Sequence, residues 1–133
     1  MARLLPMSLG QFMVLRFDAQ FVSCSNAGGG DILQISFDTM PKSEEEDRRR
    51  TPYVLISRNF EFPGSATIEW HDGHDYDGGA EITSLRLSRE CISIRVDPGL
   101  DLEVTFRLPA SKFVRLTTLL RRMIDADRIS LVD

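Results

Sequence analysis

The fold is decided by residues 82–107, which read ITSLRLSRECISIRVDPGLDLEVTFR. Apolar residues occupy alternate positions in three runs of this stretch, and a period of two is that of a β-strand with one buried face. The runs are separated by Ser88-Arg89-Glu90 and by Asp97-Pro98-Gly99, both short enough for tight turns. Strands joined by short turns pair antiparallel. The stretch therefore predicts an antiparallel meander.

The same alternation predicts further strands outside the meander. Residues Pro63-Gly64-Ser65 predict a hairpin turn between two of them. The final residues, 129–132, are predicted to form either a short edge strand or a frayed tail. The predicted upstream strands cover residues 12–22, 33–37, 53–60 and 66–70.

After the meander the apolar period changes to that of a helix. Pro109 and Ser111 open this segment, and basic residues follow near its end. Its apolar positions are Phe113, Leu116, Leu119, Leu120 and Met123. The chain is thus predicted to be α+β: an antiparallel sheet of about six or seven strands, ending in the meander, covered on one face by a single C-terminal amphipathic helix.

Composition predicts one soluble domain spanning residues 1–133. The chain is 42% hydrophobic and 27% charged, which is ordinary for a globular protein. Acids and bases without apolar residues fill the segment from Lys42 to Arg50, so residues 41–51 are predicted to form an exposed charged loop. No apolar run approaches the roughly 20 residues that would span a bilayer. Without a complete signal peptide, and with only two cysteines, we expect a cytoplasmic protein.

Charge is uneven along the chain and disfavours nucleic acid as the partner. The net charge is −4, and the interval between Arg58 and Arg86 contains six acids but no Lys or Arg. Much of that charge falls in residues 69–81, where Gly73 and the pair Gly78-Gly79 predict a turn-rich acidic loop. Aromatic residues among carboxylates are typical of a protein-binding surface. The candidate partner-binding residues are Trp70, Asp72, Asp75, Tyr76 and Asp77, of which Trp70 is either an interface or a core residue.

The sequence also offers two chemical alternatives, metal binding by this loop and catalysis by a cysteine. A small metal- or ligand-binding domain would use the cluster His71, Asp72, His74, Asp75 and Asp77. The two histidines lie three apart on a loop, and the usual calcium-loop pattern fails at its first and last positions, so a metal is disfavoured. Catalysis by Cys24 or Cys91 with a histidine is disfavoured because Cys91 lies within a predicted strand and Cys24 has no electropositive neighbour to lower its pKa. We expect no enzyme activity and no cofactor.

Five segments of the last 80 residues resemble a known family. They are Tyr53 to Arg58, Tyr76-Asp77-Gly78-Gly79 with the strand to Leu87, Ile92 to Arg95, Leu102 to Phe106, and the helix from Phe113 to Met123. Together they are similar to the tenth immunity-protein family of bacterial polymorphic toxin systems.

That resemblance implies a non-enzymatic cytoplasmic protein that neutralises a cognate toxin by occluding it, and it carries over no catalytic residues. The expected partner is a toxin with a basic surface, without nucleic acid or membrane. The charged run from Glu44 to Arg50 departs from the family pattern. A homodimer through an uncovered sheet edge stays an alternative for the assembly.

Overall fold

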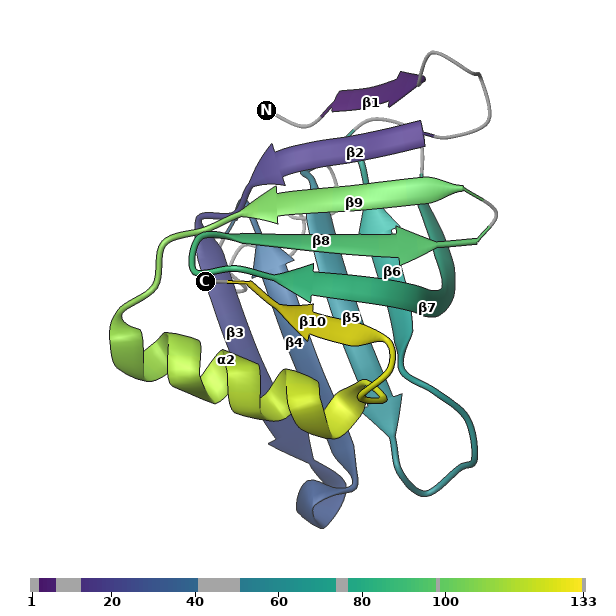
Figure 1. Ribbon diagram of the computed structural model, residues 1–133, viewed down its shortest axis with the longest axis vertical. Coiled ribbons are helices and arrows are strands. Elements are labelled where there is room, and N and C mark those ends of the chain that lie inside the picture. Colours follow the sequence, from purple (N-terminus) through teal and green to yellow (C-terminus); the bar gives the residue numbers. More distant parts are fainter. Residues whose placement is uncertain (1–2, 7–12, 41–50, 74–76, 98, 133) are drawn as a thin grey trace.

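Ten strands, one 3-10 turn and one α-helix form the part of the chain described by the computed structural model, residues 3–6, 13–40, 51–73, 77–97 and 99–132 (Figure 1). In chain order the elements are β1 (Arg3–Pro6), β2 (Met13–Asp18), β3 (Phe21–Ala27), η1 (Gly28–Gly30), β4 (Ile32–Asp38), β5 (Tyr53–Asn59), β6 (Thr67–His71), β7 (Asp77–Leu87), β8 (Cys91–Val96), β9 (Leu100–Thr105), α2 (Ala110–Met123) and β10 (Ile129–Leu131).

The strands form one hydrogen-bonded sheet in the order β1-β2-β9-β8-β7-β6-β5-β4-β3, with β10 added beside β7. The predicted α+β class and the meander β7-β8-β9 are confirmed. The predicted count of six or seven strands is too low, and the sheet is mixed. Two pairs, β2 with β9 and β10 with β7, are parallel. Parallel partners are far apart in the sequence, so no turn motif signals them.

Strand β7 joins two layers of the sheet. Residues 77–81 pair with β6, whereas residues 82–87 pair with β8 and, near their end, with β10. The register shifts between Ile82 and Ser84, which is the irregularity expected where a strand bends. Figure 1 shows the outcome: β2, β9 and β8 run across the view, and β3 to β6 run down it behind them. The front and rear layers therefore cross, as in an orthogonal sandwich.

Helix α2 completes the cover of the rear layer. It lies beside the front layer, across β3 and β4, and contacts β4 (Figure 1). Its buried side chains are Leu116, Leu119, Leu120 and Met123, so the predicted amphipathic stripe is confirmed in these residues. The guanidinium of Arg58 donates a hydrogen bond of 2.7 Å to the carbonyl oxygen of Met123, satisfying an acceptor at the helix end.

One hydrophobic cluster fills the space between the layers and the helix. Rear-layer residues such as Phe37 and Ile56 meet front-layer residues such as Leu102, and all three are fully buried. The rings of Phe37 and Phe106 lie 5.8 Å apart between centroids. The core is continuous from β2 to α2. Most of the predicted charged loop, residues 41–50, lies outside the described residues.

The strand predicted over residues 12–22 is corrected by the structure. Two strands share this segment, β2 in the front layer and β3 at the edge of the rear layer. The chain crosses between the layers at Ala19 and Gln20, where the backbone N–H groups bond to Thr105 and Asp38. Neither residue is a glycine or proline, so the alternation continued through the crossing without a signal. Within the described ranges, no helix is long and apolar enough to cross a membrane.

Candidate functional site

The predicted acidic loop over residues 69–81 is largely a β-hairpin. Strand β6 extends to His71 and β7 begins at Asp77, with Trp70 opposite Gly78 and Glu69 opposite Gly79. The loop prediction was wrong at both ends because it took Gly78-Gly79 as a turn. Neither glycine has a positive φ, and both pair within the ladder. The connection between the two strands is residues 72–76 alone.

Gly78 is explained by the packing of Trp70. The Trp70 side chain is only 5% exposed and belongs to the core cluster. A Cβ atom on Gly78 would lie 2.5 Å from Cζ2 of the Trp70 ring, so the ring occupies the space of the missing side chain. Of the two roles predicted for Trp70, interface residue or core residue, the structure shows that it is a core residue. Its ring is therefore not a surface contact for a partner.

Asp72 is also buried, at 7% exposure, contrary to the exposed binding role predicted for it. A tight turn follows it. Gly73 has a φ of 90°, and an added Cβ there would lie 3.0 Å from Cδ of Pro52. The chain at this turn therefore lies close to the residue before β5.

His71 is held by its neighbours. Its Nδ1 accepts a hydrogen bond of 2.9 Å from the Gly73 backbone N–H, and its ring stacks on Tyr53 at 6.0 Å between centroids. With Nδ1 accepting, only Nε2 is left to bind a metal or donate a hydrogen bond. In the ranges that the structure describes, no group of three metal-ligating side chains comes together. His74, Asp75 and Tyr76, which the sequence placed in this site, lie outside those ranges.

The outward side of the rear layer presents the acidic charge that the structure does describe. We call this the acidic face: the residues of β3 to β7 whose side chains point away from the core. Glu69 and Glu81 are exposed on adjacent strands of it, with Glu81 two residues beyond the Gly79 that pairs with Glu69. Tyr53 and His71 lie half-buried on the same side.

No Lys or Arg lies among the described residues of the acidic face. This follows from the register, in which paired residues share a side of the sheet. The face consists of Phe21, Ser23, Ser25, Ile32, Gln34, Ser36, Asp38, Tyr53, Leu55, Ser57, Asn59, Thr67, Glu69, His71, Gly79 and Glu81. Ser36 and Asp38 are buried, so the exposed charges described on this face are those of Glu69 and Glu81, both negative.

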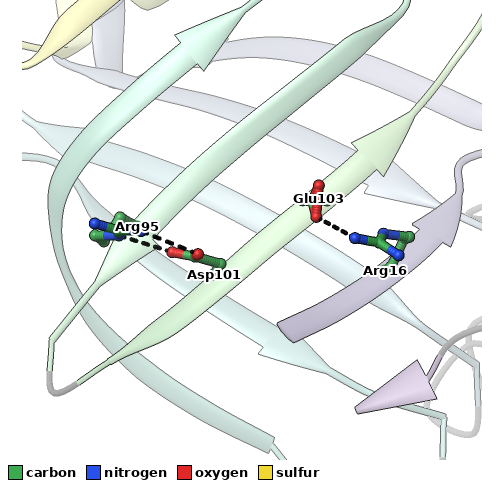
Figure 2. A network of polar contacts seen from close by, with 4 residues as sticks. All are labelled: Arg16, Arg95, Asp101 and Glu103. Atoms are coloured by element: carbon green, nitrogen blue, oxygen red, sulfur yellow. Dashed lines mark hydrogen bonds and ion pairs between the residues drawn. The ribbon is translucent and has the colours of Figure 1, made fainter. Parts of the chain in front are cut away.

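The outward side of the front layer differs because it carries charges of both signs, four of which form ion pairs. Figure 2 shows two exposed ion pairs, Arg95 with Asp101 at 2.9 Å and Arg16 with Glu103 at 2.7 Å. They border an open trough of about 460 Å³, which also contains Arg86. Acids and bases alternate along this trough, so it has no dominant sign with which to select a charged ligand.

Both thiols are poorly suited to nucleophilic chemistry. Burial raises the pKa of Cys24, an effect partly opposed by the nearby Arg115. Burial also raises the pKa of Cys91, with a smaller opposing effect from a hydrogen bond to Ser93. Since the thiolate is the reactive form, both side chains remain protonated and weakly nucleophilic at neutral pH.

The sequence interpretation missed an exposed aromatic pair in the β5–β6 connection. Phe60 and Phe62 are 41% and 66% exposed. The available signal was the turn motif Pro63-Gly64: it places both phenylalanines beyond the end of the strand, where the sheet cannot cover them.

Comparison of the chain with models of protein families, with curated proteins and with solved structures finds no match. The resemblance to the tenth immunity-protein family therefore stays a prediction from the quoted segments.

Proposed function

We propose that this protein is a non-enzymatic binding protein, an immunity protein that neutralises a cognate bacterial toxin in the cytoplasm by occluding it. The segments that resemble the tenth immunity-protein family fall on β5, β7, β8, β9 and α2. These elements contribute to both layers and to the helix that covers the core. The resemblance thus involves the framework of the molecule rather than one loop.

The observation that carries the proposal is the acidic face, with its exposed pair Glu69 and Glu81 and no cation among its described residues. Two exposed carboxylates on adjacent strands attract a basic protein and repel an acidic one. The half-buried Tyr53 and His71 on the same side also supply aromatic contact area. A toxin that acts on nucleic acid has a basic cleft, which this surface would cover.

Charge reversal on the acidic face tests the proposal. The site variant is Glu69→Lys with Glu81→Lys, both exposed positions. Asp72 is unsuitable for this experiment because it is buried. The control is Glu90→Lys with Asp127→Lys, two exposed acids in turns of the front layer and the helix connection. Both variants change the net charge equally, so they separate the local surface from the overall charge.

The measurement is the rate of association with the toxin domain encoded by the neighbouring reading frame. The rate is recorded by stopped-flow mixing at low and at physiological salt concentration. We expect the site variant to associate at least about tenfold more slowly at low salt, and the control less than about twofold. The wild-type protein should also rescue cells that express the toxin domain. Equal slowing in both variants would show that the acidic face is not the docking surface.

The alternative, a metal- or ligand-binding domain built on His71, Asp72, His74, Asp75 and Asp77, has less support. Asp72 is buried, and Nδ1 of His71 already accepts a hydrogen bond. Elemental analysis of the protein purified without chelators separates the two functions. We expect no ion at stoichiometric amount, whereas one bound ion per chain would favour the alternative.

A further inference from the structure

Two phenylalanines of the β5–β6 connection are exposed and do not belong to the hydrophobic core. We call residues 60–65 the aromatic tip. Phe62 is 66% exposed and Phe60 is 41% exposed, and they are separated by the exposed Glu61. Figure 1 shows the connection projecting beyond the lower ends of β5 and β6. Clustered exposed aromatics mark binding sites, because they contribute little to folding and much to an interface.

The tip is anchored at its base. The Phe60 N–H donates to the Asp31 carbonyl at 2.7 Å, and the Glu61 N–H donates to Oδ1 of Asn59 at 3.0 Å. The Arg58 guanidinium lies 4.9 Å from the centre of the Phe60 ring. A loop already held in one conformation loses little entropy on binding, which favours its use as an insertion element.

The charges beside the tip indicate what surrounds its binding pocket. Glu61 and Asp31 are exposed at the tip and at its base. The cation of the base, Arg58, is engaged by the Met123 carbonyl and lies 3.7 Å from Asp125. The tip therefore offers two exposed phenylalanines near the exposed carboxylates of Glu61 and Asp31. Its complement is an apolar pocket with Lys or Arg side chains at its rim.

The tip adjoins the edge of the acidic face. Strand β6 leaves the tip at Thr67, which pairs with Glu81 of β7. Phe60 itself lies beside Arg58 on the α2 side of the rear layer, so a partner that covers Glu81 would reach the tip around the end of the sheet. We infer that the aromatic tip inserts Phe62, with Phe60 beside it, into an apolar, cation-rimmed pocket of the toxin. This inference rests on the proposed function and adds a hot spot to it.

Titration calorimetry of the same toxin domain with Phe62→Ala tests the inference. Truncating a hot-spot aromatic raises Kd by at least about 30-fold, and we expect most of that effect in the dissociation rate. Phe62→Leu should recover part of the affinity because it restores apolar volume. The matched control is Val114→Ala on α2, a residue 62% exposed and far from the tip in the fold. It should leave Kd unchanged within about twofold.

Urea unfolding of each variant shows whether a change in Kd is caused by a folding defect. Because Phe62 is largely exposed, its variants should unfold at the wild-type midpoint. A Phe62→Ala protein that is folded and binds with the wild-type Kd would overturn the inference and leave the proposed function intact. Failure of the wild-type protein itself to bind would overturn both.

Discussion

A Cβ atom on Gly78 would lie 2.5 Å from Cζ2 and 2.9 Å from Cε2 of Trp70, closer than carbon atoms approach without displacement. The glycine is therefore required by packing, since its backbone is ordinary extended strand. Gly79 beside it is different. A Cβ atom added to Gly79 would lie 3.6 Å and 3.9 Å from its two nearest atoms, which is normal van der Waals contact. Two adjacent glycines in one strand thus have separate physical roles.

Alanine at each of these glycines should give opposite results. Gly78→Ala forces the buried Trp70 ring to move and should lower the free energy of unfolding by about 1–3 kcal/mol. Gly79→Ala fits without displacement and should be neutral or stabilising by up to about 1 kcal/mol, because alanine loses less backbone entropy. Urea denaturation with Trp70 fluorescence measures both. Equal destabilisation by the two substitutions would contradict the packing explanation.

The cysteines provide a prediction for pH. Burial raises the pKa of both thiols, so the folded state holds its thiol protons to higher pH than the unfolded state does. The alkylation rate of the native protein by iodoacetamide should therefore rise with pH along a curve displaced above that of an unfolded control, whose midpoint is roughly 8.5.

The raised thiol pKa also determines how the stability of the fold changes with pH. Below the thiol pKa of the unfolded chain, the buried protonated thiols make their full contribution to the free energy of unfolding. That contribution is lost as pH rises through the thiol pKa of the folded state. Comparison with a Cys24→Ser, Cys91→Ser variant should show a smaller loss of stability between pH 8 and pH 10 in the variant. Coincident alkylation curves for folded and unfolded protein would refute the raised pKa.

At the scale of elements, β7 determines the architecture because its two halves belong to different layers. The sequence predicted its second half from the alternation of Leu85 and Leu87, and it predicted β8, β9 and α2 from equally regular periods. It did not predict the first half, where glycine replaces apolar residues. Nor could it predict the parallel partners β2 and β10, since long-range pairing depends on the assembled core rather than on local spacing.

The helix is a cover for the rear layer, and this gives a prediction. Leu120 is fully buried, so Leu120→Ala should lower the free energy of unfolding by about 2–5 kcal/mol through lost burial and a residual cavity. Val114, on the same helix, is 62% exposed. Val114→Ala should change stability by less than about 0.5 kcal/mol. The midpoints of urea unfolding test both substitutions. An unchanged midpoint for Leu120→Ala would mean that α2 does not contribute to the core as described.

The candidate site was only partly predictable from the sequence, because the exposure of a residue in a strand depends on which side of the sheet it faces. Acidic composition pointed to residues 69–81, where the structure exposes Glu69 and Glu81, although neither was among the predicted binding residues. The choice of individual residues depended on the exposed side of each strand, which changes with every residue. Trp70 and Asp72 have the chemistry of interface residues, but both are buried in the folded chain.

At the scale of the molecule, the two crossed layers and α2 enclose the core against one side of the rear sheet, and the other side exposes Glu69 and Glu81 while Ser36 and Asp38 are buried. That outward side is acidic among its described residues, and the aromatic tip lies at its end. A protein organised in this way can block a basic surface by covering it. Occlusion has a quantitative signature that catalysis lacks, because each molecule of the blocker inactivates one molecule of its target.

Titration of toxin activity is accordingly the most direct test. Increasing amounts of the purified protein are added to a fixed amount of the toxin domain from the neighbouring reading frame, at concentrations well above Kd. We expect a linear loss of toxin activity that ends at one equivalent, with residual activity constant over time below that point. Complete inactivation by a small fraction of an equivalent, or full toxin activity at several equivalents, would contradict it.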